Sequence, residues 1–212
     1  MLSASRREAL AAVLEEARRR GLVGPGPVEA HIEHSLAFGD VAGWPLRGPA
    51  LDLGSGAGLP GLVLAAADRA SAWVLLDGRE KSAAFLDEAV ERLGMSKRVR
   101  VVGDRAEVAA RSEMRGQMAL VVARGVGPPA VTAECAAGFL TTGGVLVVSD
   151  PPDPDPSRWP GEGLAVLGMG PPEATTRAGF HFVRIPQERP APERFPRRTG
   201  QPAKRPLFRG FT

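Results

Sequence analysis

The 212-residue sequence contains a single cysteine and only three histidines, and these shortages exclude two kinds of site. One thiol, Cys135, cannot form an internal disulfide and supplies too few ligands for a thiolate zinc centre. It lies in the apolar stretch AECAAGFL, which is typical of a buried, unreactive thiol. The histidines, His31, His34 and His181, are not spaced like metal ligands. We therefore expect no metal and a reducing compartment.

Long hydrophobic runs are also missing. The N-terminal stretch MLSASRREALAAVLEEARRRGL alternates charge with alanine and leucine at helical spacing, unlike the continuous apolar segment of a signal peptide. No later apolar run reaches the roughly 20 residues that a membrane-spanning helix needs. With 43% hydrophobic residues, the chain can build one sizeable core. We expect a soluble, cytoplasmic protein with one α/β domain, and we favour a monomer.

Excess positive charge is confined to the C-terminal end. From Arg184 onward there are eight lysines and arginines against two glutamates, whereas the whole chain has a formal net charge of only +3. The same segment is rich in proline, which favours an extended or loosely ordered chain. It is interpreted as a solvated terminus, as an arm that binds nucleic-acid phosphates, or as a segment that packs against the sheet edge with Phe195, Leu207 and Phe208 as anchors. We expect an N-terminal helical segment at 1–40, a main domain at 41–188 and a basic, proline-rich tail at 189–212.

Hydrophobic periodicity alternates between the helix and strand patterns. Helices are predicted at 3–20, 28–38, 60–69, 80–93, 104–112 and 128–140, and strands begin near 50, 73, 98, 119, 144, 164 and 180. The first five strands are short and apolar on both faces, which indicates a parallel sheet covered by helices on each side. The last two predicted strands, LAVLG and FHFVRIP, are separated by a segment too short for a helical crossover. We expect them to form an antiparallel hairpin at one edge of a seven-stranded sheet.

The stretch LDLGSGAGLPG at 51–61 places four glycines directly after the first predicted strand. Bare backbone lets the chain turn tightly and lets a ligand approach, and Pro60 suits the first turn of the next helix. A structural turn alone would not need four spaced glycines. We therefore predict a ligand site at the carboxyl ends of the strands, where open parallel sheets bind their ligands.

Two cofactor classes fit this loop. The residues GAGLPG at 56–61 match the dinucleotide pattern G-x-G-x-x-G, and Asp77 ends the second strand, where it could hold a ribose diol. However, the chain has no tyrosine, and no His or Tyr-Lys constellation for hydride transfer accompanies the loop. From Asp52 the register also reads D-x-G-x-G-x-G. With the seven-strand plan, this register resembles class I S-adenosylmethionine-dependent methyltransferases, which have a Rossmann-like fold.

This loop and five further stretches narrow the resemblance. They are HIEHSLAF at 31, LDLGSGAGLPG at 51, LLDGREKSAAFL at 75, GDRAEVAA at 103, VVARGVGPPAV at 121 and FPRRTGQPAKRPLF at 195. In this order they are similar to the RsmG (GidB) family. The family comprises bacterial methyltransferases that act on N7 of a guanine in small-subunit (16S) ribosomal RNA, so ribosomal RNA or the small subunit is the expected partner.

The resemblance implies a site for S-adenosylmethionine. Its candidate cofactor residues are Asp52, Gly54, Ser55, Gly56, Gly58, Leu59, Asp77, Gly78, Asp104, Arg105, Ala106, Glu107 and Arg124. Arg124 is also the catalytic candidate, because the match places it near the reacting edge. The candidate RNA-binding residues are Arg194, Arg197, Arg198, Lys204 and Arg205. Each has an alternative role, since Asp77 could cap a helix, Glu107 could be solvated and Arg124 could pair with a structural carboxylate.

The chemistry implied by the resemblance makes few demands on side chains. Guanine N7 carries a lone pair and no proton, so methyl transfer needs alignment and no general base. Three departures from the family lie on the expected RNA side: Asp150 aligns where relatives have lysine, His34 replaces an aspartate, and the short polar Asn-Leu-Thr-like motif that usually precedes HIEHS is absent. The leading hypothesis is a ribosomal RNA guanine-N7 methyltransferase. The alternatives are a cofactor-binding paralogue without this activity, acting as a binding or regulatory module, and a small-molecule methyltransferase.

Overall fold

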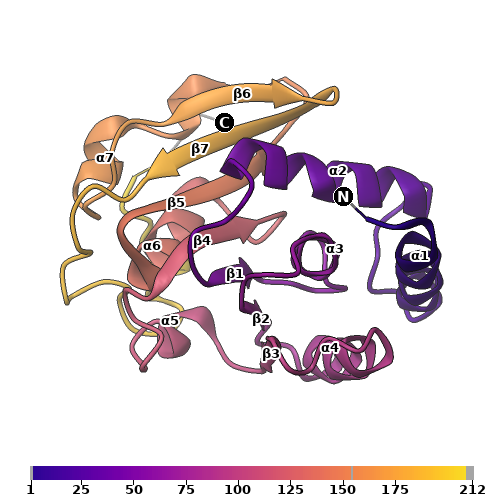
Figure 1. Ribbon diagram of the computed structural model, residues 1–212. Coiled ribbons are helices and arrows are strands. Elements are labelled where there is room, and N and C mark those ends of the chain that lie inside the picture. Colours follow the sequence, from indigo (N-terminus) through magenta and orange to yellow (C-terminus); the bar gives the residue numbers. More distant parts are fainter. Residues whose placement is uncertain (1, 154, 209–212) are drawn as a thin grey trace.

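A seven-stranded sheet forms the centre of the protein, in a computed structural model that describes residues 2–153 and 155–208. The strands are β1 (Ala50–Leu53), β2 (Trp73–Leu76), β3 (Val99–Val102), β4 (Met118–Ala123), β5 (Leu140–Asp150), β6 (Glu173–Arg177) and β7 (Phe180–Pro186). Their order is β3-β2-β1-β4-β5-β7-β6 (Figure 1). The first five run parallel, whereas β7 is antiparallel to both β5 and β6. This confirms the predicted Rossmann-like arrangement with an antiparallel edge pair.

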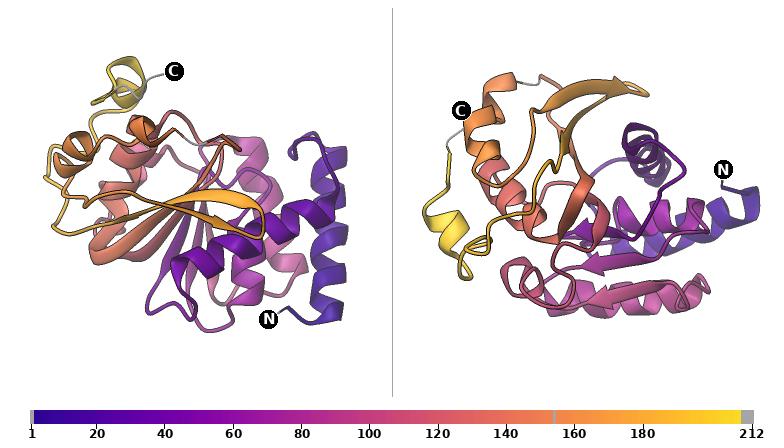
Figure 2. Two further views of the ribbon diagram at one scale, coloured as in Figure 1. Left: turned by 90° about the horizontal axis from the view of Figure 1, so that it is seen from above. Right: turned by 60° about the vertical axis from the view of Figure 1, so that its left-hand side comes forward.

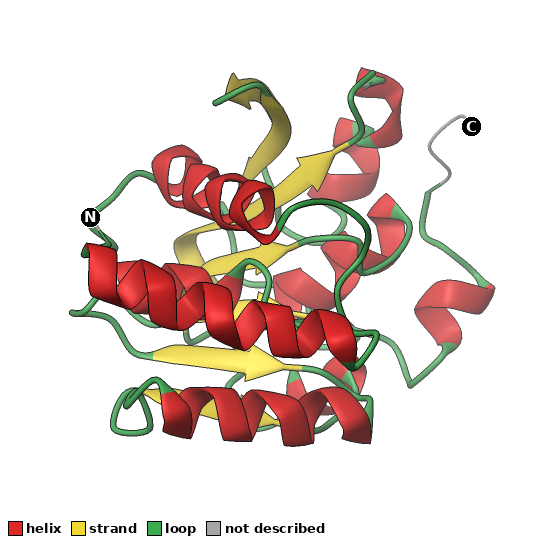
Figure 3. Ribbon diagram, turned by 90° about the vertical axis from the view of Figure 1, so that its right-hand side faces the viewer, coloured by secondary structure: helices red, strands yellow, loops and turns green. Residues whose placement is uncertain are grey.

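Helices cover both faces of the sheet. They are α1 (Ala4–Arg19), α2 (Val28–Ala42), α3 (Gly61–Ala67), α4 (Glu80–Arg92), α5 (Ala106–Ala109), α6 (Pro129–Phe139), α7 (Gly161–Ala165) and α8 (Gln201–Lys204), with a 3₁₀ turn at Pro156–Arg158. Figure 1 shows α1 to α4 on one side of the sheet and α5 to α7 on the other. Figure 3 shows α1 and α4 lying side by side, where Arg20 pairs with Glu88 at 2.8 Å.

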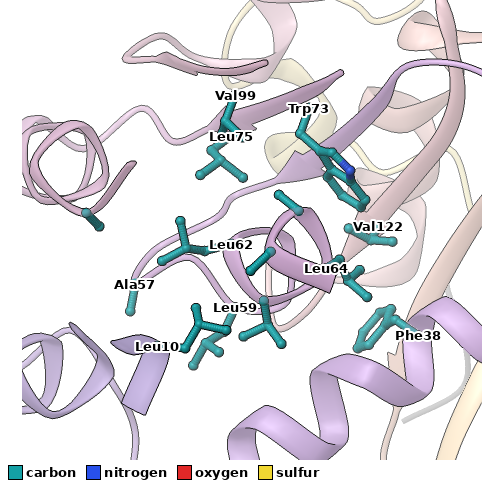
Figure 4. Close-up of a cluster of buried hydrophobic side chains, with 14 of the residues drawn as sticks. Leu10, Phe38, Ala57, Leu59, Leu62, Leu64, Trp73, Leu75, Val99 and Val122 are labelled. Atoms are coloured by element: carbon teal, nitrogen blue, oxygen red, sulfur yellow. The ribbon is translucent and has the colours of Figure 1, made fainter. Parts of the chain in front are cut away.

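Each parallel strand contributes to two separate cores, as alternation of side chains across a pleated strand requires. In β4, Leu120 and Val122 belong to the core beneath α1 to α4, whereas Val121 and Ala123 belong to the core beneath α5 to α7. Figure 4 shows the first core gathered around the apolar helix α3, with Leu62 and other large side chains packed together. The strands were predicted to be apolar on both faces and the sheet to be covered by helices on each side, and both predictions are confirmed for the parallel strands.

The edge hairpin exists, but its first strand was predicted at the wrong place. The stretch LAVLG overlaps α7 and the turn after it, where Leu164 and Leu167 are buried at helical spacing and Val166 is exposed. The true strand, β6, lies within the segment that was predicted to connect the hairpin. Every residue of β6 is exposed, so no apolar alternation identified it. Its backbone pairing with β7 creates the strand instead.

The C-terminal segment packs against the body of the protein instead of extending freely. It runs past α5 and α6 (Figure 2) and contains the short helix α8. The Phe195 side chain is 3% exposed, and Leu207 and Phe208 pack against the same core. Over residues 2–153 and 155–208, no helix is both long and apolar enough to cross a membrane.

Candidate functional site

A cleft of about 370 Å³ opens at the carboxyl ends of the parallel strands, next to the point where the strand order reverses between β1 and β4. Loops after β1, β2, β3 and β4 line it, and one residue of α8 completes it. The lining residues are Leu53, Gly54, Leu76, Asp77, Gly78, Arg79, Asp104, Arg105, Ala106, Glu107, Gly125, Val126, Val131, Cys135 and Ala203. This is where doubly wound sheets bind their ligands, and the volume suits a small-molecule cofactor.

Seven of the predicted cofactor residues meet in this cleft. They are Gly54, Asp77, Gly78, Asp104, Arg105, Ala106 and Glu107. The remaining candidates, Asp52, Ser55, Gly56, Gly58, Leu59 and Arg124, are not among the residues that line it. These seven residues come from three separate loops, after β1, β2 and β3, whereas the candidate after β4, Arg124, does not join them. The candidates that do not line the cleft are mainly residues that shape the glycine loop.

Asp52 holds the glycine loop together from beneath. Its Oδ2 atom accepts hydrogen bonds from Ser55 Oγ at 2.6 Å and from the Gly61 N–H at 2.8 Å. The carboxyl is fully buried, and burial raises its pKa to about 7. Its other oxygen, Oδ1, has no hydrogen-bond partner among the described residues. Since buried acceptors are nearly always paired, Oδ1 is a suitable partner for a donor from a bound ligand.

Asp77, at the end of β2, is 4% exposed and receives four hydrogen bonds. Two come from backbone N–H groups, of Gly56 at 2.8 Å and of Arg79 at 2.9 Å, and these fix the orientation of the carboxylate. The other two come from the Arg79 guanidinium, both at 3.1 Å. Burial alone would raise the pKa of Asp77, but these bonds together lower it. The carboxylate is therefore ionised and pre-oriented at neutral pH.

Arg79 is a residue that the sequence analysis missed. Its side chain is 70% exposed, yet its guanidinium occupies two acceptor positions of Asp77 inside the cleft. A ribose diol also offers two O–H donors, so it would take the same two positions. The spacing of Asp77 and Arg79 in DGRE could have indicated this pairing, because acid and base two residues apart share one turn.

The loop after β3 supplies the far wall of the cleft. Asp104 caps the local turn by accepting the Arg105 N–H at 2.7 Å, while Glu107 is 7% exposed at the start of α5. Glu107 accepts a hydrogen bond at 2.9 Å from the N–H of Gly200, which belongs to the C-terminal segment. Its carboxylate is therefore buried and held, not solvated. No pattern in the sequence indicated this contact across 93 positions.

Arg124, directly after β4, lies apart from the cleft lining. Its Nη1 atom is 3.4 Å from His34 Nδ1, so α2 and the end of β4 meet here. His34 also contacts the rings of Phe38, Phe180 and Phe182. Burial lowers the pKa of Arg124 and, with the Arg124 charge, lowers the pKa of His34 to about 4. His34 is therefore neutral at physiological pH, because a protonated ring would be repelled by the neighbouring Arg124 guanidinium.

The predicted RNA-binding residues divide into two groups. Arg197 forms a bidentate ion pair with Glu134, whose side chain is completely buried, so its guanidinium is already engaged. Arg194, Arg198, Lys204 and Arg205 are exposed. Over the part of the chain that the structure describes, none of these four forms an ion pair. The Arg194 guanidinium lies over the Phe195 ring, 5.0 Å from its centroid, which leaves Arg198, Lys204 and Arg205 as three cations on one short stretch.

Asp150, which stands where the family pattern has lysine, is neutralised within the protein. Its side chain is 3% exposed at the end of β5 and forms an ion pair with Arg158. The Arg158 side chain remains 27% exposed. A guanidinium therefore lies beside this strand end although the strand itself carries an acid.

Cys135 lines the cleft but is predicted to be unreactive. Burial, helped by the charges of Glu107 and Glu134, raises the pKa of its thiol to about 12. Because only the thiolate reacts, iodoacetamide should modify the native protein at pH 8 about a thousandfold more slowly than the denatured protein. Mass spectrometry of time points with and without guanidinium would measure both rates. Equal rates in the two states would contradict this assignment.

The described residues fit the predicted cofactor. Asp77 offers a pre-oriented pair of acceptors in a cleft bordered by bare backbone at Gly54, and Asp52 Oδ1, buried beneath the glycine loop, lacks a donor among the described residues. No group of three or more His, Cys, Asp or Glu in residues 2–153 and 155–208 is placed to hold a metal ion.

Comparisons with known proteins identify the family. The family model GidB, described as rRNA small subunit methyltransferase G, matches residues 13–149. The Ribosomal RNA small subunit methyltransferase G of Rubrobacter xylanophilus is 35% identical over 96% of this chain and 83% of its own length. The protein of that name from Syntrophomonas wolfei is 31% identical over 92% and 95%.

A solved structure shares the fold. An O-methyltransferase from Bacillus cereus, in complex with SAH, has a TM-score of 0.62 and 17% identity over 85% of this chain and 91% of that one. This likeness shows the fold alone, whereas the family model and the two relatives show the family. The chain therefore belongs to the rRNA small subunit methyltransferase G (GidB) family.

Proposed function

We propose that this protein is an S-adenosylmethionine-dependent methyltransferase of small-subunit ribosomal RNA and that its acceptor is N7 of a guanine. The observation that carries the proposal is the cleft beside β1, in which Asp77 presents an oriented carboxylate across from the glycine loop in a chain of this family. Ribosomal RNA is its partner, and the cytoplasm is its expected location. Family membership favours this catalyst over a cofactor-binding module without activity.

Individual residues then take separate tasks. Asp77 holds the ribose hydroxyls, and Asp52 Oδ1 accepts from the ammonium of the amino-acid part. Glu107 and Ala106 border the adenine end of the cleft. The cofactor, when bound, supplies an electrophilic methyl group. The protein has to align an acceptor that carries its own lone pair, so orientation accounts for most of the acceleration.

Arg124 is the catalytic candidate because of its position and its environment. It follows β4 next to β1, and its desolvated guanidinium faces α2 instead of bulk water. A partly buried cation interacts strongly with the electron-rich edge of a base, since the local dielectric constant is low. We propose that Arg124 positions the guanine while His34, neutral at physiological pH, packs beside it.

A methyl-transfer assay tests the proposed function. Small subunits and naked 16S RNA from a strain lacking its own enzyme are incubated with the protein and with methyl-labelled cofactor. N7-methylguanine appearing in the RNA, mapped by cleavage at the alkylated base, is the expected result. Label at another position of guanine would refute the N7 assignment, and binding of cofactor without label in either RNA would refute the catalytic role.

Neutralising the exposed cations of the tail should weaken RNA binding. In a variant carrying Arg198→Gln, Lys204→Gln and Arg205→Gln, each lost phosphate contact should lower the log–log salt slope by roughly 0.7–0.9 units. RNA affinity is measured by filter binding over a range of salt concentrations. Arg197 is left unchanged, because its removal would strand the buried Glu134 carboxylate.

A matched control carries the same charge change elsewhere. Arg69→Gln, Arg92→Gln and Lys97→Gln alter three exposed cations near the ends of α3 and α4. This control should leave the salt slope close to that of the unsubstituted protein. A slope that changes equally in both triple variants would show that only overall charge matters.

A further inference from the structure

Two arginines that follow α5 hold the C-terminal segment by its backbone. Arg115 donates to the carbonyls of Ala191 at 3.0 Å and of Phe195 at 2.8 Å. Arg111 donates to the carbonyl of Pro196 at 2.6 Å and 3.1 Å. Guanidinium groups are well suited to this task, since one planar group carries five donors. The path of the segment is thus fixed over residues 191–196.

A buried ion pair fixes the next residue of the segment. Glu134 of α6 is 0% exposed, and its carboxylate accepts from the Arg197 backbone N–H at 2.7 Å and from Arg197 Nη2 at 2.7 Å. The hydrogen bond to Glu134 also raises the pKa of Arg197. A fully buried carboxylate is rare on an otherwise apolar helix and is stable only when it is paired. This acid is therefore placed to receive the C-terminal segment.

The segment then enters the cofactor cleft. Gly200 donates its N–H to Glu107 at 2.9 Å, and three residues later Ala203 of α8 lines the cleft. Glu107 lines the same cleft from the other side of this contact. One end of the cleft is consequently built by the loop after β3 and the start of α5, and it is closed by α8, more than 90 positions later in the chain.

We infer that the C-terminal segment is a wall of the cofactor site, and that Glu134 and Arg197 are its positioning residues. Neither of them lines the cleft. They act through the backbone between Arg197 and Ala203, which they hold at the distance that lets Gly200 reach Glu107. This inference rests on the proposed function, because the ligand of the cleft is taken to be S-adenosylmethionine or its product.

The wall itself is tested with a larger side chain on α8. Ala203 lines the cleft and is otherwise exposed to solvent. Ala203→Phe therefore fills the cleft without disturbing a core. Calorimetric titration with S-adenosylhomocysteine should give at least about tenfold weaker binding, equivalent to about 1.4 kcal/mol. Gln201→Phe places the same side chain on the same helix at an exposed position outside the cleft. Its affinity should stay within about twofold of the unsubstituted protein.

The positioning pair is tested with Glu134→Gln, which keeps the shape of the side chain and removes its charge. The dissociation constant for S-adenosylhomocysteine should rise at least about threefold, at a temperature where thermal denaturation shows the variant folded. Hydrogen exchange at residues 197–204 should accelerate. Asp68→Asn is the matched control, because Asp68 is also a buried acid that accepts backbone N–H groups, but it precedes β2 at the opposite edge of the sheet. Its affinity should be unchanged.

The outcomes separate the inference from the function on which it rests. Full affinity in a folded Ala203→Phe protein would overturn the wall, and equal losses in Glu134→Gln and Asp68→Asn would overturn the positioning role. Both results presuppose that the unsubstituted protein binds S-adenosylhomocysteine. Failure of the unsubstituted protein to bind it would overturn the proposed cofactor as well.

Discussion

Replacing Asp77 with alanine should weaken the binding of S-adenosylhomocysteine at least about tenfold, because charge-assisted hydrogen bonds contribute about 1.5–3 kcal/mol. The carboxylate is the one pre-oriented pair of acceptors that β2 delivers to the cleft. Its loss also frees the N–H of Gly56, so the glycine loop loses a contact at the same time. Titration calorimetry on the folded variant measures the effect. Unchanged affinity would remove Asp77 from the cofactor site.

Arg79→Ala is the informative partner of that variant, because it should change affinity in the opposite direction. The Arg79 guanidinium fills the two acceptor positions that the ribose hydroxyls need, so its removal leaves Asp77 free. The gain should be up to about fivefold, since an ion pair this exposed is worth about 0–1 kcal/mol. The backbone N–H of Arg79 still orients Asp77. Weaker binding would mean that Arg79 contacts the cofactor instead of competing with it.

Sequence patterns predicted those parts of the protein whose structure is determined by a few neighbouring residues. Apolar pairs such as Leu75 and Leu76 in β2 have to be covered on both faces. The glycines after β1 indicate a tight turn, and three of them have a positive φ. Asp77 was found because strand ends of a parallel sheet meet at one edge. These signals occupy a few consecutive residues, so they can be read without knowing where the rest of the chain lies.

The parts that were missed depend on contacts between distant residues. Strand β6 has no apolar face and exists because β7 pairs with it. Proline content favoured an extended C-terminal segment, and packing through Phe195, Leu207 and Phe208 was only the alternative. Neither interpretation indicated that Arg111, Arg115 and Glu134 fix the segment through its backbone and Arg197. Composition describes what a segment does by itself. It contains no information about a carboxylate 63 positions away.

Gly58→Ala should lower the stability of the protein more than a left-handed backbone alone explains, because the added side chain also meets a buried helix. Gly58 has a φ of +87°, and an added Cβ would lie 2.5 Å from Leu62 Cβ, where Leu62 is completely buried in the core that Figure 4 shows. The left-handed backbone costs a side chain about 1–2 kcal/mol, and forcing extra volume into a packed core costs about 1–3 kcal/mol. The free energy of unfolding, measured with urea, should therefore fall by about 2–5 kcal/mol.

Gly94→Ala separates the two contributions to that loss. Gly94 has a similar left-handed φ of +63°, but nothing lies within 4 Å of an added Cβ, so only the backbone cost applies. Its free energy of unfolding should fall by about 1–2 kcal/mol, and its affinity for S-adenosylhomocysteine should not change. The difference between the two variants measures the contact with Leu62 alone. Equal losses would mean that the loop relaxes away from α3, and the glycine at position 58 would then be required by the backbone and not by the close approach of the helix.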